Sequence, residues 1–417
     1  KQYIHFHITK ESMAMNNNLT RSLAYVEPTI ISLLILSSFI YLLNVARSIA
    51  DRLLYAGLIG EIIVGMIYAK PLSNILKLEW EQTILDFGYL GLLLVVFQGG
   101  LETRLDFLSV KSNLFLASSV GLTGIVTPIG FSMILCTYLF RYTLLESFSM
   151  GASLSATSLG TTFSILSSQN QYQLNKSRMG TILVGAALLD DISGLVMASI
   201  IEKLQYLGQQ NIPWLICKPI VSSILMMIIS VLLSRFVLGR LWMKINFNKS
   251  YLKPHIDHLL FFLFIVSSSA MITIAAYAGA STLIGAYCCG AMLRYVDDCR
   301  MKLDDIENNQ ILFTNVFEKY IKTIKEYVFE PFFFASIGFA VPFLDLWNGQ
   351  QLWQGIVYSI LMIIGKFVTG IWILIWTYIS QRWKKPPVHV STRTPVHFSF
   401  KKKYSLNFQF YLRLKLQ

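Results

Sequence analysis

Charged residues are scarce in this sequence: they make up 14% of its 417 residues, whereas hydrophobic residues make up 54%. Soluble domains carry about 25% charged residues. Apolar runs long enough to cross a bilayer recur along most of the chain, and no segment resembles a separate soluble domain. We therefore expect an all-α polytopic membrane protein, because helices satisfy their own backbone hydrogen bonds in lipid.

The sequence also lacks the patterns of several catalytic and binding classes. None of its five cysteines has metal-ligand spacing, and most lie in apolar runs, so we interpret them as small buried hydrophobes. No glycine-rich phosphate loop is present, so we expect neither ATP hydrolysis nor any cofactor. The net charge of +12 lies in loops and near the C-terminal end rather than on one amphipathic face, which argues against nucleic-acid binding.

The apolar segments divide the chain into three parts. Residues 1–27 form a polar N-terminal segment, residues 28–380 the membrane domain, and residues 381–417 a basic polar tail. We expect about eleven membrane segments in the middle part. They run about 28–46, 52–70, 82–100, 113–139, 146–167, 178–202, 214–238, 257–278, 280–297, 328–345 and 352–380.

Lysine and arginine gather on alternate loops between these segments. If the N-terminus lies outside, the inner loops are the basic ones, which is the arrangement that the positive-inside rule favours. We therefore expect a multi-pass protein of the plasma membrane or an endomembrane, with its N-terminus outside or lumenal and its C-terminus cytoplasmic. Residues 313–328 place apolar side chains at helical spacing among lysines, which predicts an amphipathic helix on the membrane surface.

Two adjacent carboxylates, Asp190 and Asp191, lie in the middle of the apolar segment 178–202. A charged side chain at this depth costs at least about 2.5–3.5 kcal/mol, so two in a row indicate function. Neighbouring residues on a helix point about 100° apart, so the two cannot both face one partner. The pair must share a proton, bind a cation, or pair with a fixed positive group, and exchange among these states is what couples a cation to protons.

A fixed positive group is present at a similar depth. Lys366 lies halfway along the last apolar segment, too deep to reach either surface comfortably. It is either a structural lysine that neutralises an aspartate or a direct participant in transport, and the two interpretations are compatible.

The segment before the aspartates is rich in small and hydroxyl residues, among them Thr157, Ser158 and Gly160. Such residues either allow close helix packing or rebond the backbone of a broken helix that lines an ion site. Beside the aspartates we favour the broken helix, with Thr157 and Ser158 at the ion site. We give Glu61, Glu330 and Gln98 less weight, because they lie near segment ends where charge is tolerated or where a cap is expected.

Together these residues give the chain a resemblance to the cation/proton antiporters, in the bacterial-type second branch of the sodium/hydrogen exchanger domain family. Four motifs carry it in order: Gly57–Gly65, Ala152–Gly160, Ala186–Asp191, and Phe333–Gly338 followed by Gly365-Lys366. The resemblance implies that Asp191 binds the cation and the proton, and that Asp190 pairs with Lys366. It also implies inverted repeats with a discontinuous helix, a moving core bundle, a homodimer, and electrogenic exchange of Na+ or Li+ for protons.

Two further readings stay open beside this one. Family members continue past the lysine helix with a second discontinuous helix and one more, and residues 381–417 show no such segments. We interpret these helices as missing from the sequence; the alternative is a non-transporting relative. For the transported ion, the alternative to Na+ or Li+ is K+, in a K+/H+ antiporter of the same family. An intramembrane aspartyl protease is disfavoured, because its two acids belong to separate helices in contexts that this chain lacks.

Overall fold

The computed structural model describes residues 27–54, 56–70, 72–103, 111–155, 178–204, 212–240, 256–301 and 312–383. These residues are helical apart from short turns, and no strand occurs among them. The helices, some of which end in π-helical turns (η), are α2 (Ile30–Leu54), α3 (Gly57–Tyr68), α4 (Leu78–Glu102), α5 (Lys111–Ile134) with η2 (Leu135–Leu139), α6 (Leu144–Ser155), α8 (Arg178–Leu204), α9 (Ile212–Leu233) with η5 (Ser234–Leu238), α11 (Ile256–Ala278), α12 (Thr282–Met301), α13 (Phe313–Phe317), η8 (Glu318–Lys322), η9 (Lys325–Phe329), α14 (Glu330–Ala340), α15 (Phe343–Leu346) and α16 (Gly349–Trp383).

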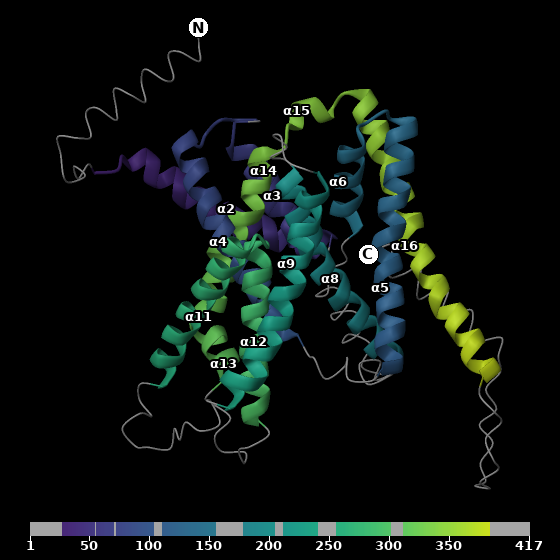
Figure 1. Ribbon diagram of the computed structural model, residues 1–417. Coiled ribbons are helices and arrows are strands. Elements are labelled where there is room, and N and C mark those ends of the chain that lie inside the picture. The colour runs from purple at the N-terminus through teal and green to yellow at the C-terminus, as the bar shows by residue number, and fades with distance from the viewer. Residues whose placement is uncertain are drawn as a thin grey trace, which may run out of the picture.

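The helices form two bundles that stand side by side (Figure 1). The larger bundle contains α2, α3, α4, α11, α12, α13 and α14, and holds two clusters of buried apolar side chains. The smaller bundle contains α5, α6, α8 and α16, where α5 packs against each of the other three. Contacts between the bundles run chiefly through α9, which packs on α8 on one side and on α12 on the other.

Glycines bring the helices of the larger bundle into backbone contact. A Cβ added at Gly290 of α12 would lie 2.2 Å from the carbonyl oxygen of Phe97, and one added at Gly100 of α4 would lie 2.2 Å from that of Tyr287. Only glycine permits this approach, and close contact through small residues is how helices associate in lipid. The α4–α12 contact is therefore the tight centre of the larger bundle.

Six of the described helices are long and apolar enough to cross a membrane. This confirms an all-helical membrane protein, while the count of about eleven segments stays a prediction. Apolar side chains also cover the outside of the bundles, as a lipid-facing surface requires; Ile31 in α2 and Phe262 in α11, for example, are 70% and 62% exposed. The six helices are Ile30–Leu54, Leu78–Glu102, Ala117–Leu139, Cys217–Phe236, Ile256–Ala278 and Gly349–Val368.

The prediction of a surface helix at residues 313–328 is wrong. Residues 313–340 form one unbroken helix that runs through α13, η8, η9 and α14. Phe313 and Phe317 lie in the main core of the larger bundle, at 5% and 3% exposure. The lysine that looked like part of a polar face, Lys325, is itself buried: Glu330 of the same helix neutralises it, and Gln98 of α4 accepts a hydrogen bond from it.

Candidate functional site

Asp190 and Lys366 meet inside the smaller bundle. Asp190 lies in the middle of α8 and is 4% exposed. Lys366 lies midway along α16, and its Nζ is 3.8 Å from Oδ2 of Asp190. A buried carboxylate is stable in its charged form only when a positive group or several hydrogen bonds compensate it, so the ammonium group accounts for an aspartate at this depth.

The same ammonium group also binds the backbone of α6. Lys366 Nζ donates a hydrogen bond to the carbonyl oxygen of Ser155, a residue that is 1% exposed. Lys366 therefore links α16 to α8 through an ion pair and to α6 through a backbone carbonyl. At its other end, helix α6 begins with a capping box, in which Thr143 Oγ1 accepts a hydrogen bond from the Glu146 amide and Glu146 Oε2 accepts one from the Thr143 amide.

The remaining predicted site residues are only partly placed. The backbone of Asp191 follows that of Asp190 in α8, but its side chain is outside the described part of the structure. Thr157, Ser158 and the expected helix break at Gly160 fall in residues 156–177, which are also outside it. Their parts in ion binding stay predictions. The described residues contain no group of three or more His, Cys, Asp and Glu side chains that could hold a metal ion.

A buried hydroxyl cluster joins α16 to α5 and α6 about two turns before Lys366. Ser132 Oγ, in α5, donates to the carbonyl oxygen of Ser147 in α6 at 2.8 Å. Its one proton is thereby used, so the hydroxyl of Tyr358, 3.1 Å away in α16, is the donor of the second bond. Tyr358 and Lys366 lie eight residues apart on one face of α16, so this cluster sets the position of the lysine relative to α6.

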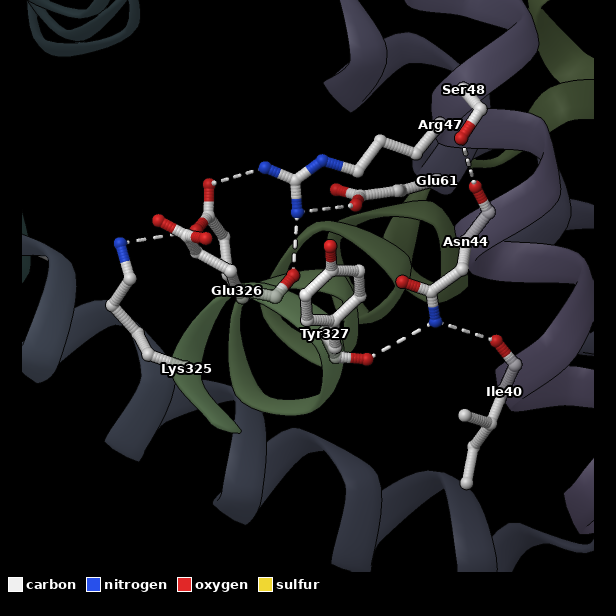
Figure 2. Close-up of polar contacts among 9 residues, drawn as sticks. Ile40, Asn44, Arg47, Ser48, Glu61, Lys325, Glu326 and Tyr327 are labelled. Carbon is white, nitrogen blue, oxygen red and sulfur yellow. Dashed lines mark hydrogen bonds and ion pairs between the residues drawn. The ribbon is translucent and has the colours of Figure 1, made fainter. Parts of the chain in front are cut away.

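A second charged network lies in the larger bundle (Figure 2). Arg47 of α2 places its guanidinium 3.4 Å from Oε1 of Glu61 in α3 and 3.4 Å from Oε1 of Glu330 in α14. The same group donates to the carbonyl oxygen of Glu326 at 2.6 Å. Glu61 is 1% exposed, so this arginine compensates a fully buried carboxylate.

Lys325 completes this network from the π-helical turn η9. Its Nζ lies 3.3 Å from Oε2 of Glu330 and donates to Oε1 of Gln98 in α4 at 2.6 Å. The network therefore contains two acids and two bases, and its formal charges sum to zero. It ties α2, α3, α4 and α14 together inside the membrane domain.

The sequence did not predict this network, because Glu61, Glu330 and Gln98 were placed near segment ends. All three belong to this buried network rather than to tolerant segment ends. One signal was available: Glu61 stands inside the apolar run Gly57–Tyr68, which has no other charge. The rest of the network could not be found in the same way, because Arg47 and its second acid, Glu330, are separated by 283 residues.

Comparison with known proteins gives a consistent result. The family model described as "Sodium/hydrogen exchanger, transmembrane" matches residues 35–411. The probable Na+/H+ antiporter GerT of Bacillus cereus is 24% identical over 328 residues, which cover 78% of this chain and 77% of GerT. The Na+/H+-K+ antiporter GerN of the same organism is 24% identical over 349 residues, which cover 81% of this chain and 77% of GerN.

A solved structure shares the fold. The sodium proton antiporter MjNhaP1 of Methanocaldococcus jannaschii matches with a TM-score of 0.54 and 16% identity, and the match covers 82% of this chain and 79% of that one.

Proposed function

The chain belongs to the sodium/hydrogen exchanger family, and we propose that it is a secondary active antiporter that exchanges Na+ or Li+ for protons across a membrane. It is thus a member of a transporter family and not of an enzyme family. The observation that carries the proposal is the buried ion pair between Lys366 and Asp190, directly beside Asp191 in the middle of α8.

Charge balance explains how this pair serves exchange. Lys366 compensates Asp190, so the second carboxylate, Asp191, is left to bind one positive charge. A proton and a monovalent cation compete for that place, because a bound cation favours the ionised carboxylate and a bound proton removes the charge that attracts the cation. Thr157 and Ser158 supply hydroxyl oxygens for the cation, and the backbone freed by a helix break near Gly160 supplies carbonyls.

The two bundles suggest how the site reaches both sides of the membrane. The smaller bundle carries Asp190 and Lys366, and it meets the larger bundle chiefly through α9. We propose that it moves against the larger bundle, which its two apolar cores and its buried charge network make rigid. Inverted repeats, a homodimer and a cytoplasmic C-terminus complete the proposal; their support is the resemblance and, for the orientation, the distribution of lysine and arginine.

A potassium-exchanging protein is the second candidate, because the relative GerN is named as a Na+/H+-K+ antiporter. The arrangement of Asp190 and Lys366 does not distinguish the two ions. Only transport measured with each cation separates them.

The experiment is proton movement in proteoliposomes that contain a pH-sensitive dye. We expect Na+ or Li+ to trigger proton movement with the wild type and not with Asp191→Asn, while Glu318→Gln, an exposed change in η8, behaves as the wild type. Activity of the Asp191→Asn variant above about a tenth of wild type, a barrier difference under about 1.4 kcal/mol, would remove Asp191 from its central role. A response to K+ alone would establish the potassium alternative, and no response of the wild type to any cation would indicate a non-transporting relative.

A further inference from the structure

One face of α6 is uncovered, and polar side chains line one half of it. Glu146 and Ser153 are exposed and Ser149 is half-buried, whereas Gly151 is buried against α5. Successive residues of a helix are turned by about 100°, so the three polar residues lie within about 60° of one another and roughly 140–160° from Gly151. They form a polar stripe, Glu146–Ser149–Ser153, that follows the open side of the helix for about 10 Å.

The polar stripe lies on the side of α6 that is nearer to α8. Ser147 and Gly151 face α5, so the buried Ala152 marks the flank that packs against α8. Ser149 is one turn from Ala152 on this flank, whereas Leu154, which is 49% exposed, lies roughly 160° away from Ala152. The open face of α6 is therefore polar along α8, the helix of the two aspartates, and apolar toward α5.

The exposed polar side chains of this stripe face water rather than lipid. Large apolar side chains cover the lipid-facing surface of the smaller bundle; Leu122 of α5 and Ile360 of α16 are 64% and 54% exposed. Lipid offers no hydrogen-bond partner to a carboxylate or a hydroxyl group. Ser153 Oγ donates its proton to the carbonyl oxygen of Ser149 at 2.5 Å, so its lone pairs remain as acceptors for water or a cation.

The polar stripe connects the end of α6 with the ion pair. Glu146 is in the first turn of α6, where the capping box holds its carboxylate. At the other end, Ser153 comes two residues before Ser155, whose carbonyl oxygen accepts from Lys366. The side chain of Lys366 is 24% exposed although that of Asp190 is only 6% exposed, so the ion pair is open on the lysine side.

We propose that the polar stripe lines the aqueous path by which monovalent cations and protons reach Asp190 and Asp191 from the side of the membrane at which α6 begins. The carboxylate of Glu146 raises the concentration of cations at the mouth of the path. Ser149 and Ser153 supply oxygen atoms along it. The identity of the ions rests on the proposed antiport, whereas the presence of water along the stripe does not.

The test is the reaction of cysteines introduced on α6 with a positively charged, membrane-impermeant methanethiosulfonate reagent, present on both sides of proteoliposomes. Cys217 and Cys299, the two native cysteines that are not buried, are first replaced by serine. Leu154→Cys is the matched control, because it is the adjacent exposed position on the apolar side. The reaction needs the thiolate, which forms in water and not in lipid, so we expect Ser153→Cys to react at least about tenfold faster than Leu154→Cys.

Glu146→Gln tests the charge at the mouth of the path. The glutamine oxygen still accepts from the Thr143 amide, so the start of α6 is retained. A unit charge about 10 Å away should change the ratio of the rates for cationic and anionic reagents at Ser153→Cys about fourfold at low salt, and hardly at all at about 1 M salt. Glu318→Gln, an exposed change on the larger bundle, should leave this ratio unchanged.

Four outcomes would each overturn the proposal. Equal rates at Ser153→Cys and Leu154→Cys would mean that water does not follow the polar side, and no reaction at either would mean that lipid or another segment covers the whole face. A rate ratio that Glu146→Gln does not change would remove the carboxylate from the path. Undiminished Na+-triggered proton movement after complete modification of Ser153→Cys would show that ions take another route. Absence of proton movement in the unmodified wild type would instead refute the proposed antiport, and the labelling rates would still decide whether water follows the stripe.

Discussion

Replacing Lys325 by methionine should destabilise the protein although it lies far from the proposed ion site. The lysine is 5% exposed and forms a network with Arg47, Glu61 and Glu330 whose charges sum to zero. Lys325→Met leaves two buried carboxylates for one guanidinium, a net charge of −1 in the larger bundle. Removing one partner of a buried pair costs about 3–5 kcal/mol, so we expect a loss of that size.

A second substitution separates charge imbalance from lost packing. Glu330→Gln, combined with Lys325→Met, leaves only Arg47 and Glu61 and restores neutrality, so the double variant should recover most of the loss. Lys322→Met is the matched control: its side chain is 41% exposed and pairs with Glu318, and such surface pairs contribute only about 0–1 kcal/mol.

The measurement is the unfolding free energy of each variant in the same detergent, from denaturant titration followed by tryptophan fluorescence. The apparent sodium affinity of the folded fraction of Lys325→Met should equal that of the wild type, because the lysine lies outside the smaller bundle. The reasoning is refuted if Lys325→Met costs no more than Lys322→Met, or if the double variant is less stable than Lys325→Met alone.

Three further predictions concern the smaller bundle. Lys366→Ala removes the compensation of Asp190, so it should lower stability by about 3–5 kcal/mol and move the pH dependence of exchange; an unchanged pH profile in proteoliposomes would contradict the pairing. Tyr358→Phe removes one buried hydrogen bond, worth about 0.5–1.5 kcal/mol, and should raise the sodium half-saturation concentration because that bond sets the position of Lys366. Ser359→Ala, at the exposed neighbouring position, should change neither the stability nor the sodium half-saturation concentration. The sodium half-saturation concentration of the wild type should fall as pH rises and then level off, because a proton at Asp191 excludes the cation and each ligand lowers the affinity for the other by the same factor. A half-saturation concentration that does not change with pH would show that the proton and the cation do not share this site.

The ion pair of the candidate site could be predicted from the sequence, because a charge in an apolar segment is conspicuous. Asp190 and Lys366 each stand in a long apolar run, and any charge at that depth carries a cost whatever its neighbours are. Two such charges of opposite sign predict each other as partners. The structure places them 3.8 Å apart, although the two positions are 176 residues apart in the sequence.

The second charged network could not be predicted in this way. Lys325 sits among other lysines in a stretch whose apolar residues repeat with a helical period, and that pattern fits a surface helix as well as a buried one. Periodicity indicates which residues share a face of a helix, but not whether that face packs against another helix, lipid or water. Only the packing of η9 and α14 against α4 and α2 brings Gln98 to Lys325 and Arg47 to Glu330.

The sequence by itself determined that this is a helical membrane protein, and where its most costly charges lie along the chain. Both follow from local chemistry: apolar length and the penalty for a charge in lipid act on one segment at a time. The tertiary structure alone decided how the helices divide into two bundles, which acids meet Arg47, and which side of α6 stays exposed. These features depend on which faces of the helices are in contact. In lipid, close packing of small residues and hydrogen bonds between distant segments determine those contacts, and neither can be read from one segment alone.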